Sequence, residues 1–93
     1  MERVTIFVRG QVQGVGFRWW TRARALELGL LGYASNMIDG RVEICAQGAV
    51  EAIERLRELI EEEPSTTRRP GRVQACVVQY GELKPGLSGF YER

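Results

Sequence analysis

The stretch Gly10–Arg18, with the sequence GQVQGVGFR, decides how this chain folds. A strand-like apolar run, Val4–Val8, comes before it, and a helix-like run, Arg18–Leu28, follows it. The stretch holds three glycines within seven residues, which lets the backbone turn tightly and approach a ligand closely. The main-chain amides of such a turn, followed by a helix N-terminus, favour an anion. The stretch therefore predicts a strand, an anion-binding loop and a helix.

Arg18 lies in the first turn of the predicted helix, and its planar guanidinium suits two phosphate oxygens at once. An unpaired cation beside the positive end of a helix dipole is unfavourable by roughly 0.3–1 kcal/mol, so a bound anion explains this position better than a plain surface cation does. The loop lacks the Lys-Ser/Thr pair of a Walker A motif and the glycine spacing of a dinucleotide fingerprint. Spacing alone therefore leaves a plain strand-to-helix turn open as the alternative.

Apolar periodicity predicts the order strand, helix, strand, strand, helix, strand. The predicted strands are Val4–Arg9, Gly32–Asn36, Arg41–Gln47 and Val73–Tyr80, with a short edge strand at Ser88–Glu92, and the predicted helices are Phe17–Leu28 and Ala49–Glu62. Right-handed crossovers make the first two strands parallel, with the third between them. We therefore predict an α+β sandwich with two helices on one face of a four- to five-stranded, mainly antiparallel sheet.

Helical spacing predicts which residues of each helix face the core. The expected apolar stripes are Phe17, Thr21, Ala25 and Leu28 in the first helix and Val50, Ile53, Leu56 and Ile60 in the second. The segment Pro64–Gly71 is typical of a mobile loop. Its basic residues Arg68 and Arg69, with Arg72 beyond them, are expected to be solvated.

Two residues far apart in sequence are predicted to meet. Parallel strands end at the same edge of a sheet, so the loop that begins at Gly10 and the strand end at Asn36 share that edge. Arg18 and Asn36, eighteen residues apart, can then face one ligand. Taken alone, Asn36 is better explained as a turn residue before the hairpin at Asp39–Gly40 than as a ligand.

Two stretches together resemble the signatures of the acylphosphatase family. Gly10–Arg18 matches the first, Gly-x-Val-Gln-Gly-Val-x-Phe-Arg, throughout. Gly32–Val42, with the sequence GYASNMIDGRV, and the later Gly48 match the spacing of the second. Ser35 departs from it, since Lys, Arg or Gln is more usual there, and this affects a surface contact rather than the chemistry. The resemblance covers nearly the whole chain and is weakest at Glu63–Arg72.

The resemblance implies a ferredoxin-like βαββαβ fold and a hydrolase that cleaves the carboxyl–phosphate bond of acyl phosphates. It implies that Arg18 holds the phosphoryl group and that Asn36 orients the attacking water. The main-chain amides expected to bind the phosphoryl oxygens are those of Gln13, Gly14, Val15, Gly16 and Phe17. A carboxylate leaves without needing a proton, so the lack of histidine is no obstacle.

Two other functions compete with the hydrolase. A non-catalytic binding module on the same fold is the first, and retention of both Arg18 and Asn36 favours the enzyme over it. An RNA-binding domain is the second, and it would stack bases on aromatic residues such as Phe7 or Tyr80 on the open sheet face. A net charge of +1 argues against nucleic-acid partners.

Length and composition limit the number of domains, the location of the protein and the metals or cofactors it could bind. Ninety-three residues predict one domain, 1–93, expected to be a monomer. No membrane-length or signal-peptide stretch is visible, so we expect a cytoplasmic protein without a membrane partner. Cys45 and Cys76 lack metal-ligand spacing, which predicts no metal and no cofactor, and they are expected to lie too far apart to pair.

Four further side chains are expected to have structural roles and no part in catalysis. Trp19 and Trp20 are expected to be packing residues, with Trp20 nearer the core. Asp39 is expected to be a turn residue and Glu43 a solvated one, and neither is predicted to be a general base.

Overall fold

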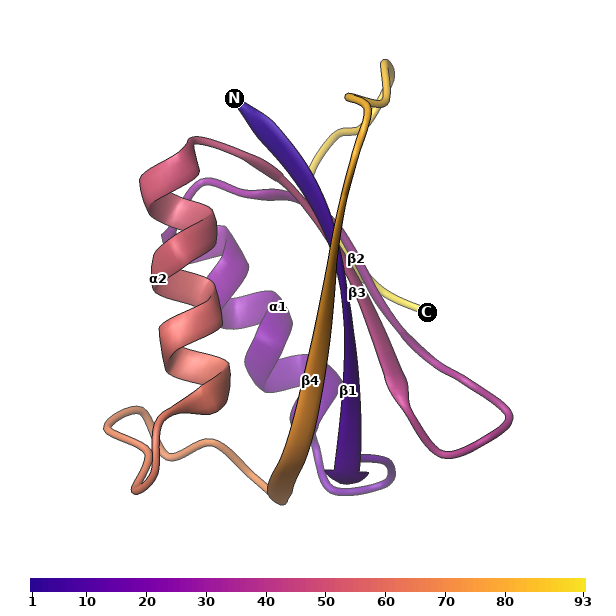
Figure 1. The fold of residues 1–93 in the computed structure, drawn as a ribbon, viewed down its shortest axis with the longest axis vertical. Helices are drawn as coiled ribbons and strands as arrows, with labels where there is room; N and C mark the ends of the chain where they lie inside the picture. Colours follow the sequence, from indigo (N-terminus) through magenta and orange to yellow (C-terminus); the bar gives the residue numbers. More distant parts are fainter.

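A computed structural model describes all residues, 1–93. Its elements are β1 (Glu2–Gln11), α1 (Phe17–Glu27), β2 (Leu31–Asn36), β3 (Val42–Gly48), α2 (Val50–Glu61), β4 (Arg72–Gly81) and β5 (Phe90–Glu92). The strands form one sheet in the order β4-β1-β3-β2-β5, and both helices lie against the same face of it (Figure 1). The predicted ferredoxin-like α+β fold is confirmed, and β5 extends it by pairing in parallel with β2.

The central strand β1 shows why the sheet forms as predicted. Val4, Ile6 and Val8 alternate along β1 and are buried beneath the helices, which matches the period of two that strands require. The strand pairs antiparallel with β3 and β4, and its register with β4 shifts at Arg9/Gly10. Gly10 has φ 143°, and a Cβ there would lie 2.1 Å from the carbonyl oxygen of Arg72. Only glycine permits this close approach of two strands.

The helix stripes are largely as predicted, but Leu28 lies just beyond α1 and is only partly buried, and α2 differs at two positions. The buried residues of the helices are Phe17, Trp20, Thr21 and Ala25 in α1 and Ile53, Leu56, Leu59 and Ile60 in α2. Val50 was expected in the core, but it is the first residue of α2 and remains 41% exposed. Leu59 replaces it, because it lies three residues after Leu56 on the face turned to the sheet.

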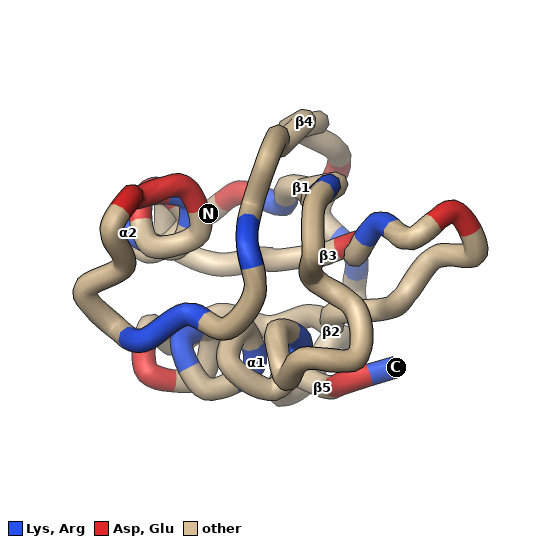
Figure 2. Tube along the Cα trace, turned by 90° about the horizontal axis from the view of Figure 1, so that it is seen from below, with Lys and Arg blue, Asp and Glu red and all other residues tan.

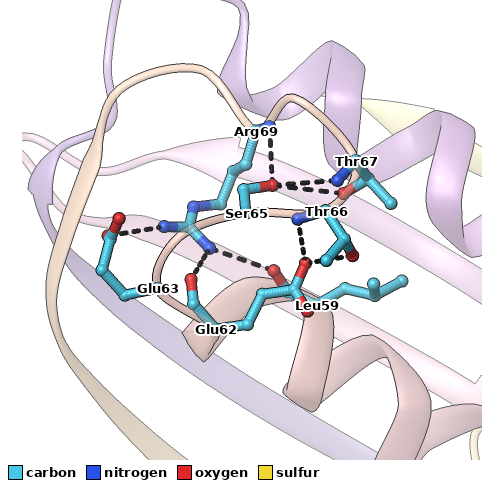
Figure 3. Close-up of polar contacts among 7 residues, drawn as sticks. All are labelled: Leu59, Glu62, Glu63, Ser65, Thr66, Thr67 and Arg69. Carbon is cyan, nitrogen blue, oxygen red and sulfur yellow. Dashed lines mark hydrogen bonds and ion pairs between the residues drawn. The ribbon is translucent and has the colours of Figure 1, made fainter.

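The connection between α2 and β4 departs most from expectation, because Arg69 is not solvated. The Arg69 side chain is only 3% exposed. Its Nη1 donates to the main-chain oxygens of Leu59, at 3.1 Å, and Glu62, at 2.8 Å (Figure 3). These carbonyls belong to the last turn of α2, where they have no partner within the helix. Arg69 therefore caps the C-terminal end of α2, where a cation is also favoured by the helix dipole.

Two further side chains hold this connection, which is defined here as the 62–71 loop. Ser65 Oγ accepts hydrogen bonds from the main-chain N–H groups of Thr67 (3.2 Å) and Arg69 (3.0 Å). The Glu62 carboxylate accepts from the main-chain N–H of Thr66 (2.6 Å) and from its hydroxyl (2.7 Å). Figure 3 shows these contacts beside the Arg69 side chain, whose guanidinium bonds separately to Leu59, Glu62 and Glu63. A segment with the composition of a mobile loop is thus organised by its own side chains.

Candidate functional site

The turn between β1 and α1, residues 12–16, leaves its hydrogen-bond donors free. The main-chain N–H groups from Gln13 to Trp19 donate no hydrogen bond to any other atom of the chain. No side chain caps the start of α1, and its first turn holds no acidic residue. A run of unpaired amides at the positive end of a helix is suited to binding an anion.

Two glycines give this turn its shape. Gly14 has φ 73° and Gly16 has φ 89°, both in the left-handed region that side chains disfavour. A Cβ on Gly14 would meet nothing within 4 Å, so the constraint there is the backbone conformation rather than space. Successive amides that include left-handed residues can converge on one point, as in other anion-binding turns.

Gln13 ties the turn to the hairpin between β2 and β3. Its Nε2 donates to the main-chain oxygens of Met37, at 2.7 Å, and Arg41, at 2.9 Å. The side chain is therefore engaged within the protein, and only the main-chain N–H of Gln13 is open to a ligand. This bridge was not predicted from the sequence, although Gln13 stands next to Gly14 inside the signature stretch.

Sheet register brings Asn36 to the same edge as the turn. Val8 of β1 pairs with Val42 of β3, and Val42 pairs in turn with Asn36 of β2. Asn36 therefore lies two strand spacings from Val8, or about 10 Å between Cα atoms. Its side chain is exposed, and its amide group makes no hydrogen bond within the chain.

Arg18 reaches toward the end of β2 from the other side. Its guanidinium donates to the main-chain oxygen of Arg93, and the Arg93 N–H donates to the Ala34 oxygen at 2.7 Å. Ala34 lies two residues before Asn36, so Arg18 and Asn36 belong to one region, as predicted. Figure 2 looks onto this edge, where the start of α1, the turn before it and the β2–β3 hairpin lie near one another.

The acidic residue of the β2–β3 hairpin, Asp39, is engaged by Arg41. Asp39 accepts from the main-chain N–H of Arg41 at 3.1 Å and from its Nε at 2.8 Å. The hydrogen bond from the Arg41 main chain is the main reason that the pKa of Asp39 lies below its usual value. Asp39 is thus an ionised turn residue in contact with Arg41, as expected, and is not suited to act as a general base.

The two tryptophans of α1 differ in burial. Trp20 is 3% exposed, and its indole N–H donates to the Thr67 oxygen at 3.1 Å, whereas Trp19 is 63% exposed. The expectation that Trp19 is a packing residue is wrong.

Cys45 and Cys76 are both free and lie in β3 and β4, with β1 between them. Burial raises the pKa of Cys76 to about 11.

No three His, Cys, Asp or Glu side chains gather as a set of metal ligands. None of the helices has the length and apolar character that crossing a bilayer requires.

Comparison with known proteins agrees with this architecture. The sequence matches the acylphosphatase family over residues 4–91. A curated relative from Thermobifida fusca (strain YX), named Acylphosphatase, is 54% identical over 91 residues, which cover 98% of this chain and 96% of the relative. The crystal structure of acylphosphatase from Bacillus subtilis has a TM-score of 0.84 at 30% identity and covers 100% of this chain and 99% of that one.

A larger protein contains a similar unit. Full-length HypF in its phosphate- and nucleotide-bound form has a TM-score of 0.81 at 28% identity, covering 99% of this chain and 12% of that chain.

The observed fold defines the class of the chain as a ferredoxin-like α+β sandwich. Within this class, the chain belongs to the acylphosphatase family, and the names of its relatives identify it as an enzyme.

Proposed function

We propose that this protein hydrolyses acyl phosphates to a carboxylate and inorganic phosphate, and that the reaction takes place at the edge shared by Arg18 and Asn36. The observation that carries the proposal is the run of unpaired amides from Gln13 to Trp19, which starts beside the end of β2. The acylphosphatase name of relatives that match nearly the whole chain supports the same reaction.

The turn and Arg18 bind the phosphoryl group. The amides of Gln13, Gly14, Val15, Gly16 and Phe17 donate to its oxygens, and the Arg18 guanidinium supplies the positive charge. This pairing accounts for a cation at the positive end of α1, which a bare helix would disfavour. In binding substrate, Arg18 exchanges its hydrogen bond to the Arg93 oxygen for bonds to the phosphoryl group.

Asn36 positions the water. Its free amide can accept from the water through Oδ1 and donate to it through Nδ2, which fixes the direction of attack. The water oxygen forms a bond to phosphorus while the bond from phosphorus to the acyl oxygen breaks in line with it. The electron pair of the broken bond leaves with the carboxylate, and the water protons remain with inorganic phosphate and solvent. A carboxylate in place of Asn36 would repel the phosphoryl oxygens.

The reaction needs no strong acid. The carboxylate leaving group is stable as an anion, so protonation contributes little to its departure. The remaining requirements are orientation and stabilisation of charge on the phosphoryl oxygens, and fixed amides with one guanidinium meet both. The proposal therefore assigns no metal ion to the reaction.

The test is release of phosphate from benzoyl phosphate by the wild-type protein beside Arg18→Ala. We expect rapid release by the wild type, near-background release by the variant, and no change in rate after prolonged treatment with EDTA. Loss of activity in EDTA that a divalent ion restores would overturn the metal-free mechanism.

The same assay separates hydrolysis from binding alone. Occurrence of a similar unit within HypF, of which it covers 12%, shows that the fold also serves as part of a longer protein. If the wild type binds inorganic phosphate in calorimetry but releases none from acyl phosphates, a non-catalytic anion-binding module is the better description.

A further inference from the structure

A hollow on the outer side of α1 lies beside the anion-binding turn and has no role in the steps described above. It has a volume of about 430 Å³ and lies between α1 and the 62–71 loop. Residues that line it include Val15, Gly16, Trp19, Thr67, Arg68 and Pro70. This hollow, called here the Trp19 groove, adjoins the anion-binding turn because Val15 and Gly16 belong to both.

The two sides of the groove are in direct contact at its base. A Cβ on Gly16 would lie 4.0 Å from the Pro70 ring, so the turn and the 62–71 loop pack against each other there. At Gly71 a Cβ would come within 3.0 Å of Val15 Cγ2. A phosphoryl group held by the amides of Val15 and Gly16 would therefore lie next to the groove.

The far wall of the groove is already held in place without a ligand. Trp20 donates through its indole N–H to the main-chain oxygen of Thr67, at 3.1 Å, which joins α1 to the 62–71 loop. Buried Arg69 anchors the same loop to the end of α2 (Figure 3). A preformed wall lowers the entropic cost of binding.

Trp19 gives the groove an unusual apolar surface. Its indole ring is 63% exposed, although it immediately follows the proposed phosphoryl ligand Arg18. The exposed ring lies in the lining of the hollow beside Val15 and Pro70, and a flat aromatic surface there favours a flat apolar partner.

Arg68 gives the groove a free positive charge. It is exposed and makes no hydrogen bond or ion pair within the chain, whereas the charge of Arg24, also in the lining, is paired with Glu27 at 2.8 Å. Arg68 also has φ 55°, a left-handed conformation that is uncommon for a long side chain. Residues held in such conformations cluster at ligand-binding sites.

We infer that the Trp19 groove binds the acyl part of the substrate and favours a flat, apolar acyl group that carries a second anionic group. The acyl group stacks on Trp19 while its phosphoryl group sits on the amides of the turn, and Arg68 attracts the second anion. This inference rests on the proposed function, because it assigns the part of the same substrate that leaves.

The experiment compares kcat/KM for three substrates: acetyl phosphate, benzoyl phosphate and benzoyl phosphate with a carboxylate at the para position. We expect Trp19→Ala to lower the preference for benzoyl over acetyl phosphate by about 3- to 10-fold, the size of one aromatic contact. Trp19→Phe keeps an aromatic ring and should retain most of that preference.

Arg68→Gln tests the second part of the inference. It removes the charge at similar side-chain length, and should lower the preference for the carboxylated substrate over plain benzoyl phosphate by about 2- to 5-fold at low salt. Leu26→Ala is the matched control, because Leu26 is another exposed apolar residue of α1 that does not line the groove. It should leave both preferences unchanged.

Each outcome decides between the two proposals. Unchanged substrate preferences in Trp19→Ala, with normal turnover of all three substrates, would overturn the groove and leave the hydrolase standing. A wild type that releases phosphate from none of the three would overturn the proposed function and the groove with it. Circular dichroism melts of each variant separate a change in preference from a loss of folded protein.

Discussion

Two loops lie at the same edge of this molecule and treat their main-chain polar groups in opposite ways. The turn at residues 12–16 leads into α1 and leaves its amides unpaired, while the 62–71 loop follows α2 and its Arg69 donates to the carbonyls of Leu59 and Glu62 at the end of that helix (Figure 1). Both loops place an arginine near a helix end. Arg69 sits at the negative end of α2, where a cation is stabilising, and Arg18 sits at the positive end of α1, where it is not.

The difference shows that polar groups without a partner in the chain mark a binding site better than charged residues do. Contacts within the chain hold the Arg69 guanidinium, because helix carbonyls and Glu63 surround it and only its buried Nε lacks a partner. The amides from Gln13 to Trp19 have no partner in the chain, and their unused hydrogen-bonding capacity points outward to a ligand. Two arginines near helix ends are thus distinguished by whether the polar groups around them find hydrogen-bond partners within the chain.

The largest effect is expected from Arg18. Arg18→Ala should lower kcat/KM by about 10³-fold and weaken competitive inhibition by inorganic phosphate, because it removes the only guanidinium assigned to the phosphoryl group. Arg18→Lys should remain strongly impaired, since a point charge cannot reproduce two parallel hydrogen bonds. Steady-state kinetics with phosphate as inhibitor measures both effects.

Arg22→Ala supplies the control for Arg18. Arg22 lies one turn further along α1 and its Nε donates to the Phe90 oxygen at 3.1 Å, so it also joins α1 to β5. It should leave phosphate inhibition unaltered. Near wild-type activity in Arg18→Lys would show that the two-pronged contact is not needed.

Asn36→Ala is expected to have the next largest effect, and to act on turnover alone. The phosphoryl group would still lie on the turn with Arg18, so the inhibition constant of inorganic phosphate should stay the same. Without an oriented water, kcat should fall by about 10²-fold. Calorimetry with phosphate beside steady-state kinetics separates the two quantities, with Ser35→Ala as the neighbouring control. Full turnover in Asn36→Ala would make Asn36 a turn residue only.

The position of the site at one edge of the sheet could be predicted from the sequence, because it depends on strand periodicity and on the order of the elements. The alternation of Val4, Ile6 and Val8 set the buried face of β1, and the order of elements made β1 and β2 parallel with β3 between them. These two facts suffice to bring Arg18 and Asn36 to one edge. Their roles in catalysis remain predictions.

The 62–71 loop could not be predicted, because its structure depends on particular side chains meeting across the loop. Nothing in the local pattern distinguishes Arg68, which is exposed and unpaired, from Arg69, which is 3% exposed. The difference arises only once the end of α2 presents its carbonyls to one of them. Val50 and Trp19 were misjudged for a related reason, since helical spacing shows which residues share a face but not how far the covering layer extends.

The contrast between neighbouring arginines can be measured as stability. Arg69→Met keeps the apolar stem but leaves the carbonyls of Leu59 and Glu62 without a donor, and should lower the free energy of unfolding by about 2–4 kcal/mol. Arg68→Gln should change it by less than about 0.5 kcal/mol, as exposed substitutions usually do. Urea unfolding of the three proteins measures both. Equal stability of the two variants would mean that the cap on α2 contributes little.

The smallest expected effect is a pH dependence within the 62–71 loop. Hydrogen bonds to the Glu62 carboxylate, first from the Thr66 main-chain N–H and then from its hydroxyl, hold the pKa of Glu62 below its usual value of 4.5. Since the folded pKa is lower than the unfolded one, the stabilisation is complete above the unfolded value. It is lost as the pH falls through the folded value.

Glu62→Gln tests this dependence, because it keeps the shape of the side chain without a charge that titrates. The wild type should be more stable than Glu62→Gln at neutral pH, and the difference should shrink as the pH falls from about 5 to about 3. Urea midpoints across this range measure the difference, and Thr66→Val, which lacks the hydroxyl donor, should narrow it at neutral pH. A gap that stays constant with pH would show that the charge on Glu62 does not hold the loop. The structure of the 62–71 loop would then depend on the hydrogen bonds of Arg69 and Ser65 alone.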